Sequence, residues 1–343
     1  MQMRDAINAL MRRDDLTFDQ MHALMRQIML GVASDAQVGA LLMGLAMKGE
    51  TATEISAAAQ VMRELMNRVT PNAGADVVDI VGTGGDGADL FNVSTASSFV
   101  AAAAGANVAK HGGRSVSSSS GSADLFDVAG IFLNLNPEQV ARCIDEVGVG
   151  FMFAPNHHPA MRHAVSPRRE MGVRTLFNIL GPLTNPAGAP NQLLGVYDPS
   201  LVVLLAEVLK KLGSRHVMVV HSDDGLDEIS LAAPTLVAEL KDGEITQYRI
   251  TPEALGVERQ SLAALKADGV EDSLRLVKMA LRGEGAPAGI VSLNAGAALY
   301  CAGVADTLQE GVRLARNAQE DGLPLEKMAE LSRFTTQFKS QSQ

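Results

Sequence analysis

The chain of 343 residues contains no tryptophan, few aromatic residues and only two cysteines, Cys143 and Cys301. Two cysteines outside any CxxC pair are too few for a disulfide framework, and they indicate a reducing compartment. Because aromatic residues make up only 4% of the chain, Ala, Leu, Val and Met have to fill its core. Such core residues favour helices packed on a parallel sheet over a β-sandwich.

Long apolar runs and basic stripes are also missing. The least polar stretch, residues 96–109, contains Ser, Gly and Asn, and it is shorter than the roughly 20 residues that a transmembrane helix needs. The N-terminus carries charges throughout and lacks the apolar segment of a signal peptide. The net charge of -10 repels polyanions. We therefore expect a cytoplasmic protein whose partners include neither nucleic acid nor a membrane.

The sequence changes character near residue 70. Before it, the apolar spacing at residues 19–30, a cap at Asp35 and the N-cap pair Thr51 and Glu54 predict a run of helices. After it, short apolar segments alternate with helical ones, which predicts a mostly parallel sheet. The expected strands are 77–81, 107–109, 151–153, 193–197 and 217–221, and the expected helices are 94–104, 122–129, 137–147 and 200–212.

This alternation predicts an α/β fold with a small all-helical domain and a large α/β domain whose central sheet is mostly parallel. The small domain is expected at residues 1–70, and the large one at 75–157 and 185–343. A turn at Asp242 and Gly243 predicts an antiparallel edge hairpin over residues 236–250, and residues 288–293 are expected to return the chain to the sheet. The junction of the two domains is a natural place for a ligand site.

A glycine-rich segment, residues 82–87, directly follows the first expected strand. It fits a plain turn between strand and helix, and it also fits the dinucleotide fingerprint G-x-G-x-x-G. That fingerprint requires a helix that opens at the motif and an acid about 20 residues later. Here the helix begins near Ser94, and the next strand ends in Lys110. A nicotinamide site is therefore disfavoured, and a P-loop is excluded because no Gly-Lys-Ser/Thr follows.

Two further segments are suited to phosphate. Residues 92–95 open an Ala-rich helix, where Ser and Thr can cap the helix and also hold an anion at its N–H groups. Residues 110–122 follow a strand and carry two cations among glycines and serines. Because the carboxyl ends of parallel strands meet at one edge of a sheet, the three segments together predict a ligand with more than one phosphate.

Carboxylates and arginines complete the pattern. An acidic loop after a strand is normally just solvated, but beside phosphates Asp227 and Glu228 suit Mg²⁺, with Asp223 and Asp224 as weaker candidates. The spacing of the three histidines at 157, 158 and 163 is not a zinc pattern. An arginine at 168 or 169 would suit a carboxylate substrate if it lies near the site.

Taken in order, these segments resemble the anthranilate phosphoribosyltransferase family. The matching pieces are VDIVGTGGDG, FNVSTASSFVAAAAGANVAKHG, RSVSS, SGSADL, APNHHPAM, RREMGVRTLFNILGPLTNPAG, DGLDEIS and LNAGAALY. The resemblance implies transfer of the phosphoribosyl group of phosphoribosyl pyrophosphate to the amine of anthranilate. It also implies two Mg²⁺ ions, a homodimer formed through small-domain helices, and the return of residues 158–182 to the small domain.

The family's site residues map onto this sequence by motif. Those for phosphoribosyl pyrophosphate are Gly82, Gly85, Asp86, Asn92, Ser94, Thr95, Lys110, Ser118 and Ser122. Those for anthranilate are Gly82, Gly113 and Arg168, and those for metal are Ser94, Asp227 and Glu228.

Three positions depart from the family pattern. Gly113 stands where an Asn commonly contacts anthranilate, Leu90 where a Thr or Ser is common, and Ser119 where a Lys is common. These departures concern the acceptor contact and part of the phosphate affinity.

The implied reaction displaces pyrophosphate from C1 of the ribose. An aromatic amine is neutral at pH 7, so catalysis rests on positioning and charge stabilisation, and no general base is assigned. His111 is the one nearby candidate, and it could instead shape the loop. Three alternatives remain: a pyrimidine nucleoside phosphorylase, a same-fold protein that binds nucleic acid, and an enzyme with a different acceptor.

Overall fold

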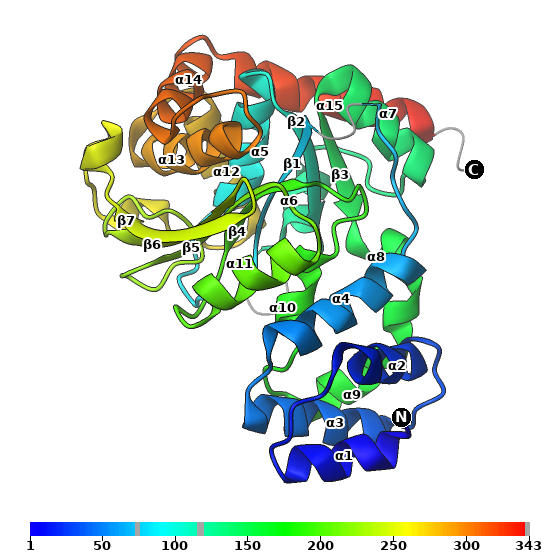
Figure 1. Cartoon of the computed structure of the whole chain (residues 1–343). Helices are drawn as coiled ribbons and strands as arrows, with labels where there is room; N and C mark the ends of the chain where they lie inside the picture. Colours follow the sequence, from blue (N-terminus) through cyan, green and yellow to red (C-terminus); the bar gives the residue numbers. More distant parts are fainter. Residues whose placement is uncertain (73–75, 115–119, 340–343) are drawn as a thin grey trace.

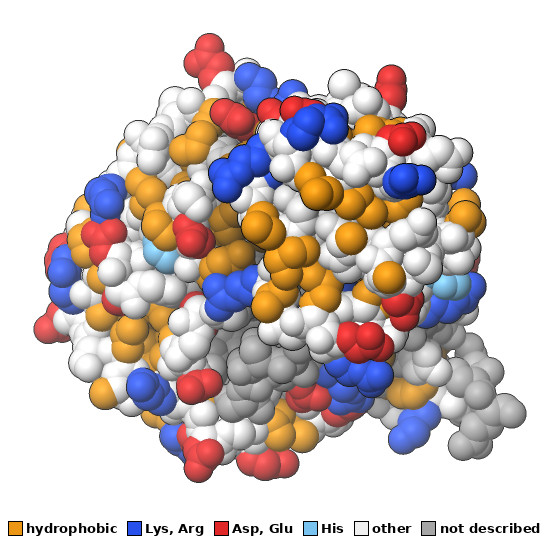
Figure 2. All heavy atoms as spheres, turned by 90° about the horizontal axis from the view of Figure 1, so that it is seen from below, with side chains coloured by type: hydrophobic (Ala, Val, Ile, Leu, Met, Phe, Trp, Pro, Cys, Tyr) orange, Lys and Arg blue, Asp and Glu red, His pale blue; other side chains and the backbone are white. Residues whose placement is uncertain are grey.

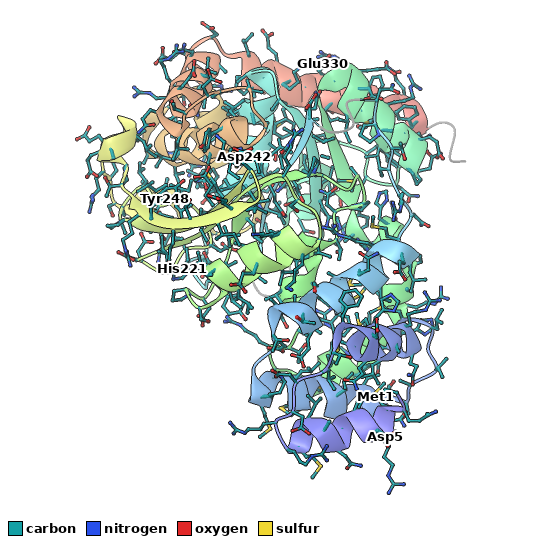
Figure 3. The ribbon with its side chains drawn as sticks, viewed as in Figure 1. Met1, Asp5, His221, Asp242, Tyr248 and Glu330 are labelled. Carbon is teal, nitrogen blue, oxygen red and sulfur yellow. The ribbon has the colours of Figure 1, made fainter. Side chains whose placement is uncertain are left out.

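The computed structural model describes residues 1–72, 76–114 and 120–339. Figure 1 shows a large lobe built on a central sheet and a small helical lobe beneath it. Figure 3 places Met1 and Asp5 in the small lobe, and His221, Asp242 and Tyr248 in the large one. Within the described part of the chain, no helix combines the length and apolar character needed to cross a bilayer.

The small lobe starts with four helices whose beginnings are set by short polar motifs. They are α1 (Met3–Met11), α2 (Phe18–Met29), α3 (Asp35–Lys48) and α4 (Ala52–Leu65). Thr17, Ser34 and Thr51 cap the last three, each with a capping box that pairs the cap with the third helical residue. Such a box satisfies backbone donors that the first helical turn leaves free, so the predicted cap at Thr51 is confirmed.

The large lobe contains a seven-stranded sheet in the order β3-β2-β1-β4-β5-β6-β7. The strands are β1 (Val77–Gly82), β2 (Asn107–Gly112), β3 (Val149–Phe153), β4 (Asn191–Gly195), β5 (His216–Ser222), β6 (Thr235–Lys241) and β7 (Glu244–Ile250). The first five are parallel, whereas β6 and β7 form an antiparallel hairpin at the edge. The predicted fold class and the predicted hairpin are therefore confirmed.

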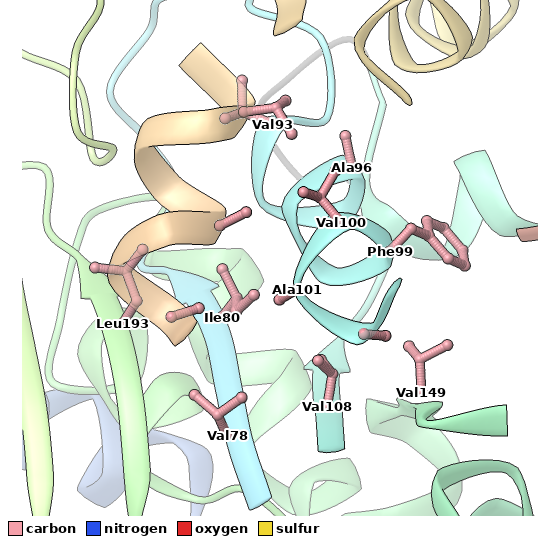
Figure 4. Packing of buried hydrophobic residues seen from close by; sticks show 14 of the residues in the cluster. Val78, Ile80, Val93, Ala96, Phe99, Val100, Ala101, Val108, Val149 and Leu193 are labelled. Atoms are coloured by element: carbon pink, nitrogen blue, oxygen red, sulfur yellow. The ribbon is translucent and has the colours of Figure 1, made fainter. Parts of the chain in front are cut away.

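Helices cover both faces of this sheet. They are α5 (Val93–Ala103), α6 (Ser122–Val128), α7 (Pro137–Val147), α11 (Leu201–Lys211), α12 (Val270–Leu281), α13 (Gly285–Cys301), α14 (Leu308–Glu320) and α15 (Leu323–Lys339). Successive residues of a strand face opposite sides: Leu193 packs in a core cluster with α5 and α13, and Leu194 in the cluster with α4 and α11. Figure 4 shows Phe99, Val100 and Ala101 of α5 beside Val78 and Val108 of the sheet.

The sequence predictions at Asp35 and at residues 288–293 are wrong. Helix α3 is capped by Ser34, and Asp35 is its first helical residue. Residues 288–293 do not form part of the sheet but lie inside helix α13, which packs against α5, α14 and β4. Nearly every residue of α13 is buried, so the segment shows no amphipathic period of 3.6 residues. A short apolar run of this kind does not distinguish a buried helix from a buried strand.

After β3 the chain passes through α8 (Ala154–His157) and then α9 (Arg162–Met171). Helix α9 packs against α2 and α3 of the small lobe, and Ala164 of α9 shares a core cluster with them. The chain then runs through α10 (Phe177–Leu180) to β4. The small lobe and the α11 face of the sheet thus share one continuous core.

Candidate active site

The candidate site lies at the carboxyl ends of β1 and β4. These strands are neighbours although β2 and β3 come between them in the sequence, so the strand order reverses here. Ligands of open α/β sheets bind in the crevice at such a reversal. Gly82, at the end of β1, lies opposite Gly195, at the end of β4.

The loop that carries Asp227 passes closely over these two glycines. A Cβ atom on Gly82 would collide with the carboxylate of Asp227, and one on Gly195 would collide with its backbone carbonyl. The backbone N–H of Gly84 donates a hydrogen bond of 2.7 Å to Asp227 Oδ2. The glycine loop and the acidic loop, 143 residues apart in sequence, are therefore held against each other.

Gly195 was not among the site residues predicted from the sequence. An isolated glycine inside a strand often marks a close backbone approach, so its position within the predicted strand 193–197 was a usable signal. The structure supplies the reason, because the chain carrying Asp227 occupies the space that a side chain at 195 would need.

Three carboxylates crowd together at this edge. Burial and then Asp86 raise the pKa of Asp227, while burial and then Asp227 raise the pKa of Glu228 well above its usual range. All three residues keep part of their surface exposed, so a ligand can reach them. Nearby carboxylates disfavour each other's ionised forms, and a divalent cation would relieve this repulsion. The donor set therefore fits a metal ion.

Lys110 of β2 lies close enough to these acids to interact with their charges. Its ammonium donates hydrogen bonds to Ile80 O (2.7 Å) and Ser94 Oγ (3.2 Å), and the residue is 1% exposed. Burial lowers the pKa of Lys110, and Asp79, Glu228 and Asp227 oppose that shift. Lys110, which was predicted to bind the phosphorylated ligand, thus lies next to the predicted metal ligands Ser94, Asp227 and Glu228.

Helix α5 begins at this edge, as the sequence predicted. Its N-cap is Asn92, and the backbone N–H of Ser94 lowers the pKa of Glu228 against the larger effect of burial. The described residues contain no ready-made set of three His, Cys, Asp or Glu ligands for a metal. Substrate oxygens and water would therefore complete the coordination of a hard cation such as Mg²⁺.

A second polar cluster lies beside the first. The side-chain oxygen of Asn92 accepts from Ser120 Oγ (2.9 Å) and Ser273 Oγ (2.7 Å). Thr95 Oγ1 donates to Ser122 Oγ over 3.0 Å, which joins the starts of α5 and α6. Three of the predicted phosphate-binding residues are therefore connected to neighbouring polar groups, while Ser118 and Ser119 lie outside the described residues.

Leu90 does not take part in this polar cluster. It packs at the margin of the large core and forms an isolated bridge with Lys266. Leu90, which stands where the family commonly has Thr or Ser, thus packs against apolar side chains.

The predicted acceptor residues come from separate elements, and only Arg168 is on a helix that packs against the small lobe. Arg168 is in the last turn of α9, half-buried, with its guanidinium 5.2 Å from the ring centroid of Phe177. Gly113 follows β2, and a Cβ atom there would meet no heavy atom of the described residues within 4 Å. The described residues therefore leave room for a Cβ atom at 113.

Arg174 is a site candidate that was not predicted from the sequence. Its guanidinium donates to the carbonyl of Gly85 (2.5 Å) and lies 4.2 Å from the ring centroid of Tyr197. It therefore connects the segment after α9 to the glycine loop. It lies inside the matching piece RREMGVRTLFNILGPLTNPAG, where only Arg168 and Arg169 were considered as partners of a carboxylate.

His111 is buried next to the site. Its ring lies 5.0 Å from that of His158, and its Nε2 has no hydrogen-bond partner among the described residues. Burial, and then the charge of His158, hold the pKa of His111 well below its usual range. His111 is therefore a neutral imidazole at pH 7.

Two family models match the chain. The α/β domain of a glycosyl transferase family matches residues 74–325, and the helical bundle domain of a glycosyl transferase family matches residues 4–66. The chain is 72% identical to an anthranilate phosphoribosyltransferase of Chromohalobacter salexigens over 335 residues, which covers 98% of this chain and 97% of that one. It is 58% identical to the enzyme of the same name from Marinomonas, with 99% of each chain covered.

Solved structures agree with these relatives. The structure resembles a crystal structure of anthranilate phosphoribosyltransferase from Thermus thermophilus with a TM-score of 0.91, 42% identity, and coverage of 97% of this chain and 99% of that one. It also resembles the Saccharomyces cerevisiae enzyme in complex with PRPP (phosphoribosyl pyrophosphate) and Mg, with a TM-score of 0.89, 25% identity and 98% coverage of both chains. Together with the residues gathered at the β1–β4 edge, these matches show that the chain belongs to the anthranilate phosphoribosyltransferase family.

Proposed function

We propose that the protein transfers the phosphoribosyl group of phosphoribosyl pyrophosphate to the amine of anthranilate, giving N-(5-phosphoribosyl)anthranilate and pyrophosphate in tryptophan biosynthesis. The observation that carries this proposal is the meeting of the glycine loop, Lys110 and the Asp227–Glu228 pair at one sheet edge. A donor with a diphosphate and a metal needs this combination of backbone donors, a cation and carboxylates.

The glycine loop and helix α5 would hold the donor. Gly84, Gly85 and Gly87 have φ values of 67°, 81° and 71°, a conformation that glycine adopts without strain and that lets the backbone approach an anion closely. Asn92, Thr95 and Ser122 line the adjacent helix starts and offer polar contacts to phosphate oxygens. Ser118 is proposed for the same role by its motif alone.

Asp227 and Glu228, with Ser94, would hold Mg²⁺, and we propose two ions. When bound, the metal would neutralise charge on the diphosphate and stabilise pyrophosphate as the leaving group. The ammonium of Lys110 would act on the same oxygens from within the protein. Because Lys110 is fixed by Ile80 and Ser94, its charge is positioned before the donor arrives.

Anthranilate would enter from the side of the small lobe. Arg168 would bind its carboxylate, and Gly82 and Gly113 would border its ring and amine. The amine of anthranilate is neutral at pH 7, so the chain has to orient it and does not have to deprotonate it before attack. We assign no general base.

Further proposals concern the setting of this reaction. We propose residues 1–70 together with 158–182 as the small domain, because α9 packs on α2 and α3, and residues 75–157 and 185–343 as the large one. We also propose that the protein works in the cytoplasm, since Cys143 and Cys301 are both buried and free.

A homodimer through the small-domain helices is proposed as well. Hydrophobic side chains gather on the face seen from below in Figure 2, where the small lobe is nearest to the viewer. Met11, Val32 and Met47 of the small lobe are 78%, 72% and 69% exposed, and such apolar surface is typical of an interaction site. Light scattering of the purified protein would test this, and a monomer at micromolar concentration would contradict it.

The loss of anthranilate fluorescence tests the proposed reaction directly. Purified protein is mixed with anthranilate, phosphoribosyl pyrophosphate and Mg²⁺, and in parallel with anthranilate, inorganic phosphate and Mg²⁺. Fluorescence should fall only with phosphoribosyl pyrophosphate, and EDTA should prevent the fall. No reaction with anthranilate, but reaction with another amine, would show a different acceptor.

A further inference from the structure

A buried carboxylate, Asp79, lies in β1 below the site and has no role in the reaction described above. It is 0% exposed, although its neighbours Val78 and Ile80 belong to the apolar core. An ionisable group in such a place is unfavourable unless it is paired or hydrogen-bonded. Its presence in the central strand therefore calls for a partner.

Asp79 lies just beyond the last residue at which β1 pairs with β2. Strands β1 and β2, both fully described, share a paired register at Val77 with Asn107 and at Val78 with Val108, and the register stops there. Beyond this point β1 stays paired with β4 as far as Gly82, and β2 stays paired with β3 as far as Gly112. The backbone ladder between β1 and β2 therefore ends before the carboxyl ends of these strands.

Side chains from both strands replace the missing ladder. Asp79 Oδ1 accepts from the backbone N–H of His111 at 3.2 Å, and the ammonium of Lys110 donates to the carbonyl of Ile80 at 2.7 Å. Asn185 completes the bridge, because its Nδ2 donates to Asp79 Oδ2 (2.7 Å) and to Ala109 O (2.8 Å). Each strand is thus tied to a side chain of the other.

The two bridging side chains carry opposite charges. Of the acids that act on buried Lys110, Asp79 contributes most, ahead of Glu228 and Asp227. Lys110 is in turn the strongest influence opposing the effect of burial on the pKa of Asp79, which stands at about 6. Glu228 and Asp227 would face a metal when the donor is bound, whereas Asp79 is closed off from solvent and remains a counter-charge for Lys110.

We infer that Asp79 is a positioning residue, which with Asn185 holds the backbone of β2 on both sides of Lys110 and so keeps the Lys110 ammonium aimed at the diphosphate of the donor. This inference rests on the proposed function, because it assumes that Lys110 contacts the donor. Asp79 itself touches neither substrate. Its effect should therefore be seen in donor binding and should require Lys110.

The test compares donor affinity in single and double variants. Calorimetry with phosphoribosyl pyrophosphate and Mg²⁺ is run on the wild type, Asp79→Asn, Lys110→Met and the double variant. Asp79→Asn keeps the side-chain shape and should weaken donor binding by about tenfold or more, the size of one charge-assisted contact. In the Lys110→Met background the same substitution should change the affinity less than about twofold, because coupled residues are non-additive.

A variant elsewhere in the sheet separates positioning from a merely structural role. Glu239→Gln, which removes a buried acid on β6 far along the sheet order, is the matched control and should lower the melting temperature while leaving donor affinity unchanged. If Asp79→Asn does not fold, Asn185→Ala takes its place, with a smaller loss of affinity that again depends on Lys110.

The outcomes distinguish this inference from the proposed function. If the wild type does not bind the donor, the proposed function itself is wrong. A wild type that binds, together with an Asp79→Asn variant that binds equally well, would overturn the positioning role. Equal losses in the presence and absence of Lys110 would show that Asp79 only stabilises the fold.

Discussion

Replacing Gly195 by alanine should disable the site without touching a functional group. A Cβ atom at 195 would overlap the carbonyl oxygen of Asp227, and the two atoms need about 3 Å of separation. The backbone of β4 is held by pairing with β1 and β5 on both sides. The acidic loop, and with it the carboxylates of Asp227 and Glu228, therefore has to move.

The size of the effect follows from that movement. Relieving the overlap requires a shift of more than about 1 Å, and a misplacement of this size can cost on the order of 10²-fold in rate. Overpacking at a rigid position also costs about 1–3 kcal/mol of folding free energy, which lowers the melting temperature by several degrees. Catalysis should thus fall far more than stability.

The assay is the rate of anthranilate fluorescence loss, measured together with thermal unfolding. Gly39→Ala is the control, because an added Cβ on α3 would meet only Met171 Sδ at an ordinary 3.7 Å. That variant should retain its activity and should be as stable as the wild type or more so, since alanine is the better helix former. A Gly195→Ala variant with more than a third of wild-type kcat/KM would refute the reasoning.

Three other perturbations test separate parts of the molecule. Asp227→Asn should lower turnover by on the order of 10²–10³-fold, because one electrostatic contact to the leaving group is lost; near-normal turnover would show that no metal depends on it. Arg168→Ala should weaken the use of anthranilate by about tenfold or more but leave the use of aniline, which lacks the carboxylate, nearly unchanged; equal losses on both amines would exclude a carboxylate contact. Burial raises the pKa of Glu239, but hydrogen bonds from His216 and Tyr248 outweigh it and hold the pKa at about 2. The depressed pKa means that Glu239 contributes stability above its unfolded pKa of about 4.3 and loses it as the pH falls toward 2. In urea unfolding, the stability gap between wild type and Glu239→Gln should therefore shrink between pH 5 and pH 2, and a constant gap would contradict the assignment.

Local patterns were sufficient for much of the fold. The capping pair at Thr51 and Glu54 marked the start of α4 because such a cap involves residues only three positions apart. The alternation of apolar strands and helices predicted the parallel sheet, and the turn at Asp242 predicted the edge hairpin. The motif order also predicted the family, which the relatives confirm.

Packing between distant segments decided the rest. Residues 288–293 became a helix because α13 is surrounded by α5, α14 and the sheet, and a segment buried on all sides has no periodicity to read. The hydrogen bond from Arg174 to Gly85 joins two segments that are 89 residues apart in the sequence. Nothing within a few residues of either position carried that information.

The sequence by itself determined which residues can bind phosphate, metal and carboxylate, since that follows from side-chain chemistry and motif spacing. Only the tertiary structure decided that Gly195 must lack a side chain and that Asp79 binds the backbone of β2 next to Lys110. Both depend on contacts between segments far apart in the sequence, whose closeness is set by strand order and by the space left between backbones. The sequence marks both positions, a glycine within one expected strand and an acid within another, but it does not show which distant segments they contact.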